Sequence, residues 1–221
     1  MKHALVIGAS GGIGSAISSE LSARGYSVTG LSRSANGLDV TDEASVKAAL
    51  SDVNQPMSLI FVATGALEPG GHKPEKALRE VTPAALEAAF RINAIGPLLV
   101  LKHSLHLLPK NAPSVFAALS ARVGSIGDNG IGGWHSYRAS KTALNQLIHG
   151  AAIELKRTHK QACAVCLHPG TVETSFTEKY ASRHKNVPAP QAAANLVNVI
   201  EGLTTAQSGG FFDYAAQKIP W

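Results

Sequence analysis

Cysteines, aromatic residues and charged residues are all scarce in this sequence. Its 221 residues include two cysteines, 5% aromatic side chains and 16% charged side chains, against 45% apolar ones. Two cysteines cannot build the disulfide framework of a small secreted protein. Low charge with high apolar content excludes a disordered chain. We therefore expect a single domain, residues 1–221, around a buried core.

Long apolar runs and basic clusters are also missing. The first apolar run stops at Gly8, which is too short for a secretory signal, and no run reaches the roughly 18 apolar residues of a membrane span. A cytoplasmic protein with no membrane partner is therefore expected. The net charge of +5 comes from scattered residues, so nucleic acid is not an expected partner.

The two cysteines form a C-x-x-C at Cys163 and Cys166, inside an apolar run that is typical of a buried strand. A zinc site would need two further ligands, and His168 alone does not supply them. We expect two buried, reduced thiols and no metal.

Short apolar runs alternate with longer segments of helical periodicity. Strands are expected over 3–7, 26–31, 58–62, 114–119, 161–167 and 210–213. Helices are expected over 12–24, 43–53, 82–108 with an interruption near Gly96-Pro97, 133–159 and 190–203. The alternation predicts an α/β fold, a single doubly wound Rossmann-type domain whose parallel sheet is flanked by helices on both faces. The irregular stretch 171–190 is expected to form a lid.

A glycine-rich turn joins the first expected strand to the first expected helix. Gly8 permits a sharp turn, Gly12 lets the backbone approach a pyrophosphate, and Gly14 lets the helix pack closely on the strand. The turn also contains Ser10 and Ile13, and free N–H groups at the helix start favour an anion. A dinucleotide site is therefore predicted in the first half of the chain, roughly residues 1–110.

The second strand is followed by Arg33, where an acidic residue would accept hydrogen bonds from a ribose 2′-hydroxyl. A guanidinium suits a 2′-phosphate instead. NADP(H) is therefore expected in preference to NAD(H), which stays the alternative. Asp39 and Val40 are expected to flank the adenine, because they follow the same edge of the sheet.

Tyr137 and Lys141 lie four residues apart in a helical pattern, which puts both side chains on one face. A neighbouring ammonium favours the phenolate and lowers the tyrosine pKa from about 10 towards working pH, as acid–base catalysis requires. The pair predicts a proton-transferring centre in the second half of the chain, roughly residues 111–221.

These motifs, with Arg91-Ile92-Asn93-Ala94 and Pro169-Gly170-Thr171-Val172-Glu173-Thr174, resemble the short-chain dehydrogenase/reductase family over essentially the whole chain. The stretch 124–129 and the Phe211-Phe212 ending are similar to its C-factor branch, which includes sniffer-like carbonyl reductases. The resemblance implies NADP-dependent hydride transfer between nicotinamide and a carbonyl or alcohol substrate, in a homodimer or homotetramer. A C-factor-like signalling or nucleotide-sensing protein with weak or no turnover is the alternative.

The resemblance also implies roles for single residues. Tyr137 would protonate the carbonyl oxygen, Lys141 would hold the nicotinamide ribose and lower the tyrosine pKa, and Asn93 would support a water-linked proton path. Further cofactor contacts are implied at Gly65, Pro169, Gly170, Val172 and Thr174.

One family feature is altered. The usual Ser-Ser pair reads Ser120-Ala121 here, and Ala121 falls on the position of the carbonyl-polarising serine. Ser120 is expected to take that role, with Ser125 or no serine at all as alternatives. Because side chains alternate across a strand, the orientation of Ser120 decides between them.

Overall fold

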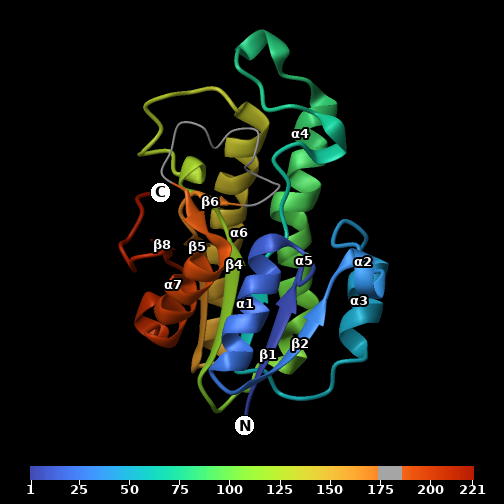
Figure 1. Ribbon diagram of the computed structural model, residues 1–221, viewed down its shortest axis with the longest axis vertical. Helices are drawn as coiled ribbons and strands as arrows, with labels where there is room; N and C mark the ends of the chain where they lie inside the picture. Colours follow the sequence, from blue (N-terminus) through green and yellow to red (C-terminus); the bar gives the residue numbers. More distant parts are fainter. Residues whose placement is uncertain (174–185) are drawn as a thin grey trace.

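The computed structural model describes residues 1–173 and 186–221. Six strands form one sheet in the order β2-β1-β3-β4-β5-β8 (Figure 1), and every neighbouring pair is parallel. The strands are β1 Lys2–Ile7, β2 Tyr26–Leu31, β3 Leu59–Val62, β4 Ser114–Leu119, β5 Ala162–His168 and β8 Phe211–Asp213. The chain reverses its direction across the sheet between β1 and β3, so a topological switch point lies there.

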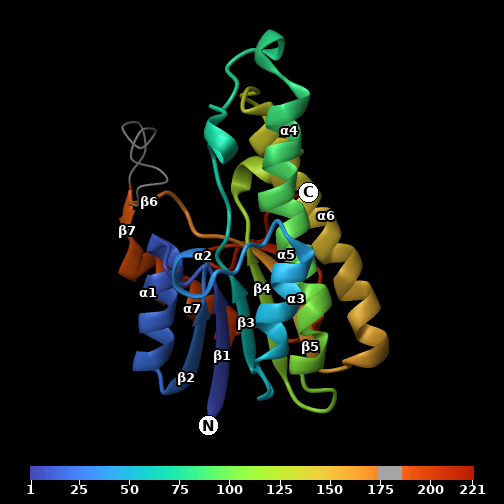
Figure 2. The ribbon, with the colours of Figure 1, turned by 90° about the vertical axis from the view of Figure 1, so that its right-hand side faces the viewer.

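Helices cover both faces of this sheet. They are α1 Gly12–Ala23, α2 Arg33–Asn36, α3 Glu43–Ser51, α4 Pro83–Phe90, α5 Gly96–Ser104, α6 His135–Thr158 and α7 Ala189–Glu201. Figure 2 shows α1 and α7 on one face and α3, α5 and α6 on the other. The doubly wound α/β fold expected from the sequence is confirmed.

The core consists of two apolar layers, one on each face of the sheet. Along β1, Leu5 and Ile7 enter the layer under α3, α5 and α6, while Ala4 and Val6 enter the layer under α1 and α7. All four are fully buried. A strand buried on both faces must be continuously apolar, which is why these strands stand out in the sequence.

The long helical run is interrupted close to the expected place. It is interrupted by a π-helical turn at Arg91–Ile95, and Gly96 and Pro97 simply begin α5. On either side of this turn the run has different neighbours, because α4 packs on α6 and α5 packs on α3. The run Pro83–Leu107 is long and apolar enough to cross a membrane by those two measures alone. Within this run, Ala94, Val100, Leu101 and Leu107 are buried in the core layer under α3, α5 and α6.

A small second sheet was not expected from the sequence. Its strands, β6 Val172–Glu173 and β7 Val187–Pro188, are parallel, and the Val187 N–H donates to the Thr171 carbonyl at 2.9 Å. They close the base of the stretch expected to form a lid. The rest of that stretch, including Thr174, lies outside the described residues.

Both cysteines are buried and unbridged within β5. Burial raises the pKa of the Cys163 thiol to about 11 and that of the Cys166 thiol to about 12. Both are therefore protonated and weakly reactive at neutral pH.

Candidate active site

The glycine-rich turn lies at the carboxyl edge of the sheet, directly after β1. Gly8 adopts a positive φ of 84°, and its N–H donates to the Leu31 carbonyl of β2 at 2.7 Å. A Cβ on Gly14 would lie 2.1 Å from the Gly8 carbonyl oxygen. The turn can therefore be this tight only with glycine at position 14, and it is fastened to the end of β2.

The start of α1 is open to an anion. No side chain caps Gly11, and the first intrahelical bond runs from the Ser15 N–H to the Gly11 carbonyl. The N–H groups of Gly12, Ile13 and Gly14 precede that bond, so they are left for an external acceptor. Ser10 and Gly12 are exposed. The site fits a pyrophosphate.

A second observation at this edge also fits a dinucleotide. Thr64 follows β3, and its methyl carbon would lie 3.2 Å from a Cβ on Gly8. Its Oγ1 is buried and has no hydrogen-bond partner in the part of the chain that the structure describes. A buried polar atom in this state calls for an external partner, and a ribose hydroxyl would supply one.

The residues expected on the adenosine side follow β2. Arg33 begins α2 and is exposed, while Ser32 caps this helix by accepting from the Ala35 N–H at 3.2 Å. Asp39 accepts two bonds from Thr41, which lower its pKa, and the charge of Arg33 lowers it further. The Asp39 carboxylate is thus held by the protein, and Arg33 is the group presented to solvent.

The remaining expected cofactor residues at this edge of the sheet are Val40 and the residues that follow β5. Val40 is buried, and its Cγ2 would lie 2.9 Å from a Cβ on Gly96, so it packs against α5. Pro169 and Val172 are buried, and Gly170 has a positive φ of 80°. Apart from Tyr137 and Lys141 on α6, the expected cofactor residues within the described ranges therefore lie after the carboxyl end of a strand or at the start of the following element.

Gly65 brings the two halves of the site together. A Cβ on this glycine would lie 3.2 Å from Oδ1 of Asn93 and 3.3 Å from Nζ of Lys141. The Lys141 ammonium also donates to the Leu119 carbonyl at 2.8 Å. Residues from the ends of β3 and β4, the π-helical turn and α6 thus meet at one point.

Asn93 is fully buried, and both polar atoms of its side-chain amide form hydrogen bonds. Its Oδ1 accepts from the Ala66 N–H at 2.8 Å, and its Nδ2 donates to the Ala66 carbonyl at 2.9 Å and to Oγ of Ser140 at 3.1 Å. The π-helical turn projects this amide onto the loop after β3, a use of π turns that is common at functional sites. Asn93 braces the loop that carries Gly65 against α6.

Tyr137 and Lys141 lie on the buried face of α6, as expected. Burial raises the pKa of Tyr137 well above its ordinary value and lowers the pKa of Lys141 to about 8. The net shift of the Tyr137 pKa is therefore upward and not downward as expected, because desolvation dominates. A raised pKa keeps the Tyr137 hydroxyl protonated at neutral pH, which is the state that a proton donor needs.

The contacts of Ser120 disfavour the catalytic role expected for it. Its hydroxyl is buried and donates to Oδ1 of Asn145 at 2.7 Å. Asn145 lies eight residues beyond Tyr137 on α6, about 12 Å along the helix axis. Ala121, the next residue, is in extended conformation, so its side chain points to the side of the chain opposite to that of Ser120.

The alternative serine is not available either. The Ser125 hydroxyl donates to the Pro220 carbonyl at 2.6 Å and accepts from the Asp128 N–H. Ser125 thus fastens the loop after β4 to the closing segment of the chain. Of the three alternatives that the sequence left open, the one without a serine donor agrees best with these contacts.

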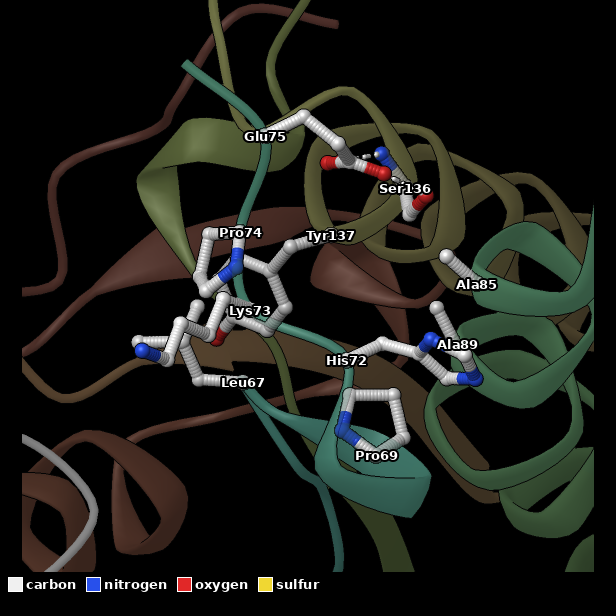
Figure 3. Close-up of a pocket in the computed structure, with 10 residues that line it drawn as sticks. All are labelled: Leu67, Pro69, His72, Lys73, Pro74, Glu75, Ala85, Ala89, Ser136 and Tyr137. Carbon is white, nitrogen blue, oxygen red and sulfur yellow. Dashed lines mark hydrogen bonds between the residues drawn. The ribbon is translucent and has the colours of Figure 1, made fainter. Parts of the chain in front are cut away.

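Sequence reasoning missed two positions. Asn145 follows Tyr137 and Lys141 at the next helical interval, so its place on the same face was readable. Glu75 gave no such signal, because it lies in an irregular segment between β3 and α4. Its carboxylate accepts from the N–H of Ser136 at 3.1 Å and from the Ser136 hydroxyl, and its carbonyl accepts from the Trp134 N–H at 2.6 Å. Glu75 thus joins this segment to the first turn of α6 (Figure 3).

Comparison with known proteins agrees with this geometry. A family model described as short chain dehydrogenase matches residues 2–185. This chain is a short-chain dehydrogenase/reductase. The family consists of NAD(P)-dependent oxidoreductases.

Two relatives of this short-chain dehydrogenase/reductase show its place in the family. C-signal of Myxococcus xanthus is 37% identical over 145 residues, which cover 66% of this chain and 84% of that protein. The 1-hydroxy-2-glutathionyl-2-methyl-3-butene dehydrogenase of Rhodococcus sp. (strain AD45) is 32% identical over 239 residues and covers both chains fully. The resemblance to the C-factor branch is confirmed.

Solved structures show the same fold. A Burkholderia multivorans short-chain dehydrogenase/reductase with bound NADP has a TM-score of 0.85 at 24% identity and covers 100% of this chain and 99% of its own. The carbonyl reductase Sniffer of D. melanogaster has a TM-score of 0.82 at 20% identity and covers both chains fully. At these identities the likeness is one of fold.

Proposed function

We propose that this short-chain dehydrogenase/reductase is an NADP-dependent carbonyl reductase in which Tyr137 donates the proton. The observation that carries the proposal is the meeting of Asn93 and Lys141 around Gly65, with Tyr137 one turn before Lys141 on α6. This meeting point lies at the same sheet edge as the anion-binding turn. One edge therefore offers both a dinucleotide site and a protonated acid.

When bound, the nicotinamide supplies the hydride that adds to the carbonyl carbon. Tyr137 gives its hydroxyl proton to the carbonyl oxygen, so that an alcohol forms and a tyrosinate remains. The Lys141 ammonium stabilises that anion and holds the ribose, and Asn93 supports the water-linked return of the proton. Oxidation of an alcohol would reverse these steps.

The choice of NADP over NAD rests on Arg33. It follows β2 and is exposed, at the position where an acidic residue would bind a ribose 2′-hydroxyl. A guanidinium forms paired hydrogen bonds with a phosphate. The bound NADP in the Burkholderia neighbour and the NADPH in a chicken carbonyl reductase of the same fold support this choice.

Replacing Tyr137 with Phe tests the proton donor. Loss of a general acid lowers turnover by roughly 100- to 10,000-fold, while cofactor binding at the turn is retained. Both are measured on one sample, by NADPH absorbance loss with a panel of aldehydes and ketones and by calorimetry with NADPH. Retention of turnover in the Phe variant would contradict the proposal.

A second candidate function is nucleotide sensing with weak or no turnover. The observation that favours it is Ala121, which leaves the carbonyl without the hydroxyl donor that the family uses, and C-signal is a relative. The same titrations separate the two: a sensor binds NADPH but oxidises it with no carbonyl compound, and Tyr137→Phe leaves its biological effect intact.

We also propose a homodimer or homotetramer built on the helices that carry Asn93 and Tyr137. Ile95 and Ile153 lie on this helical layer and are 44% and 50% exposed. Light scattering of the purified protein tests the assembly, and a monomer at micromolar concentration would contradict it.

A further inference from the structure

The segment between β3 and α4 forms one wall of a pocket that opens on Tyr137 (Figure 3). Much of the lining is small and apolar, and these residues are Leu67, Pro69, Pro74, Ala85 and Ala89. Such a lining suits a short aliphatic body and leaves selectivity to the few polar groups present. Those groups are three neighbouring residues of the same wall, His72, Lys73 and Glu75, together with Ser136.

Glu75, the acidic residue of this set, is already hydrogen-bonded within the protein. Both carboxylate oxygens of Glu75 accept hydrogen bonds from Ser136, at the N-terminal turn of α6. Glu75 is only 3% exposed. Burial raises its pKa, but the hydrogen bonds from Ser136, a backbone hydrogen bond at Glu75 itself and the charge of His135 together lower it more, so the group stays ionised. The negative charge of Glu75 is thus stabilised by the N-terminus of α6 rather than by a ligand.

The basic members are presented to the pocket instead. Lys73 and His72 are exposed and line the same pocket as Tyr137, and neither forms an ion pair within residues 1–173 or 186–221. Glu75 holds the backbone of this wall against α6, and from it the His72 ring points towards Ala89 while the Lys73 ammonium points to the opposite side (Figure 3). In the described lining, the ammonium of Lys73 is therefore a positive charge without an ion-pair partner.

We propose that the substrate of this enzyme is a short oxo acid, whose carboxylate is bound by Lys73 while its carbonyl oxygen meets Tyr137. The inference rests on the proposed function and adds the chemical class of the substrate. The apolar wall accepts the carbon chain, and the ammonium of Lys73 pairs with the carboxylate. Neutral carbonyl compounds of equal size lack this contact.

Matched pairs of substrates test the inference. Acetoacetate and 4-oxopentanoate are compared with their methyl esters by NADPH absorbance loss, in the wild type, in Lys73→Gln and in the control Lys76→Gln. Lys76 is an exposed lysine of the same segment that does not line the pocket. The wild type and the control are expected to prefer the acids about fivefold in kcat/KM, as an exposed ion pair allows. Lys73→Gln removes the preference, mainly through KM, and leaves NADPH affinity unchanged.

Two results would overturn the inference while leaving the proposed function intact. One is equal use of acid and ester by the wild type, and the other is an equal loss of acid preference in Lys73→Gln and Lys76→Gln. If NADPH binds but no carbonyl compound of either charge is reduced, the proposed function itself fails, and the substrate class fails with it.

Discussion

The Ser120 hydroxyl donates a 2.7 Å hydrogen bond to Oδ1 of Asn145, two helical turns beyond Tyr137. This contact ties the end of β4 to α6, whereas the adjacent Ala121 occupies the position that the family gives to a carbonyl-polarising serine. We therefore expect Ser120 to affect the stability of the fold and position 121 to affect catalysis.

Ser120→Ala is expected to cost about 1 kcal/mol of unfolding free energy through the lost hydrogen bond and to leave kcat within about twofold, since it removes no donor from the carbonyl. Ala121→Ser is expected to raise kcat about tenfold, because one well-placed donor is worth at least that much. Urea denaturation and steady-state kinetics measure the two effects. A Ser120→Ala variant that is stable but inactive would show the opposite assignment.

Gly14→Ala is expected to destabilise the fold by about 3 kcal/mol and to abolish NADPH binding. The added methyl group would lie 2.1 Å from the Gly8 carbonyl oxygen, so the turn must open. Gly150→Ala is the matched control, because a methyl group added to this exposed helical glycine would meet no atom of another element within 4 Å. The control is expected to gain about 0.8 kcal/mol from helix propensity. Thermal melts and calorimetry compare the pair.

Arg33→Ala is expected to weaken NADPH binding roughly 10- to 100-fold, because charge-assisted hydrogen bonds to the 2′-phosphate are lost. NADH binding should change little. Lys110→Ala serves as the control, since this exposed lysine precedes β4 at the opposite edge of the sheet. Fluorescence titrations with both cofactors measure the affinities of the wild type and the two variants, and a parallel loss of NADPH and NADH affinity in Arg33→Ala would contradict the assignment.

Lys141→Met is expected to stabilise the protein by about 2 kcal/mol at pH 7, since burial of the ammonium costs more than its bond to Leu119 returns. Burial lowers the pKa of Lys141 to about 8. Between about pH 8 and 10.5 the unfolded chain binds more protons than the folded one, so wild-type stability rises with pH across that window. The advantage of the Met variant should therefore shrink from pH 8 upwards.

Denaturation at pH 7, 8, 9 and 10 measures this shrinkage, and Lys156→Met, an exposed position on the same helix, is the control with no such pH dependence. A constant difference between Lys141→Met and the wild type over the whole range would mean that Lys141 is not desolvated.

The strands and helices of this fold were readable because each is marked by local periodicity. Strands buried on both faces, such as β1, are continuously apolar, and α6 carries Tyr137 and Lys141 at a helical interval. The direction of Ser120 was not readable, because alternation gives two faces without saying which one meets α6. Glu75 was hidden for a different reason: its partner Ser136 lies 61 residues away in the chain, and no local pattern encodes that contact.

The π-helical turn at Arg91–Ile95 has a consequence for chain length. Each residue of a helix advances its faces by about 100°, so α4 meets α6 and α5 meets α3 only for the present number of residues between them. Deleting one residue here would rotate one of these helices away from its neighbour and withdraw Asn93 from Ala66. Insertions and deletions in related sequences should therefore avoid this helix and collect in the exposed loop that precedes α6. Substitutions within the helix that keep its residue count are expected to be far better tolerated.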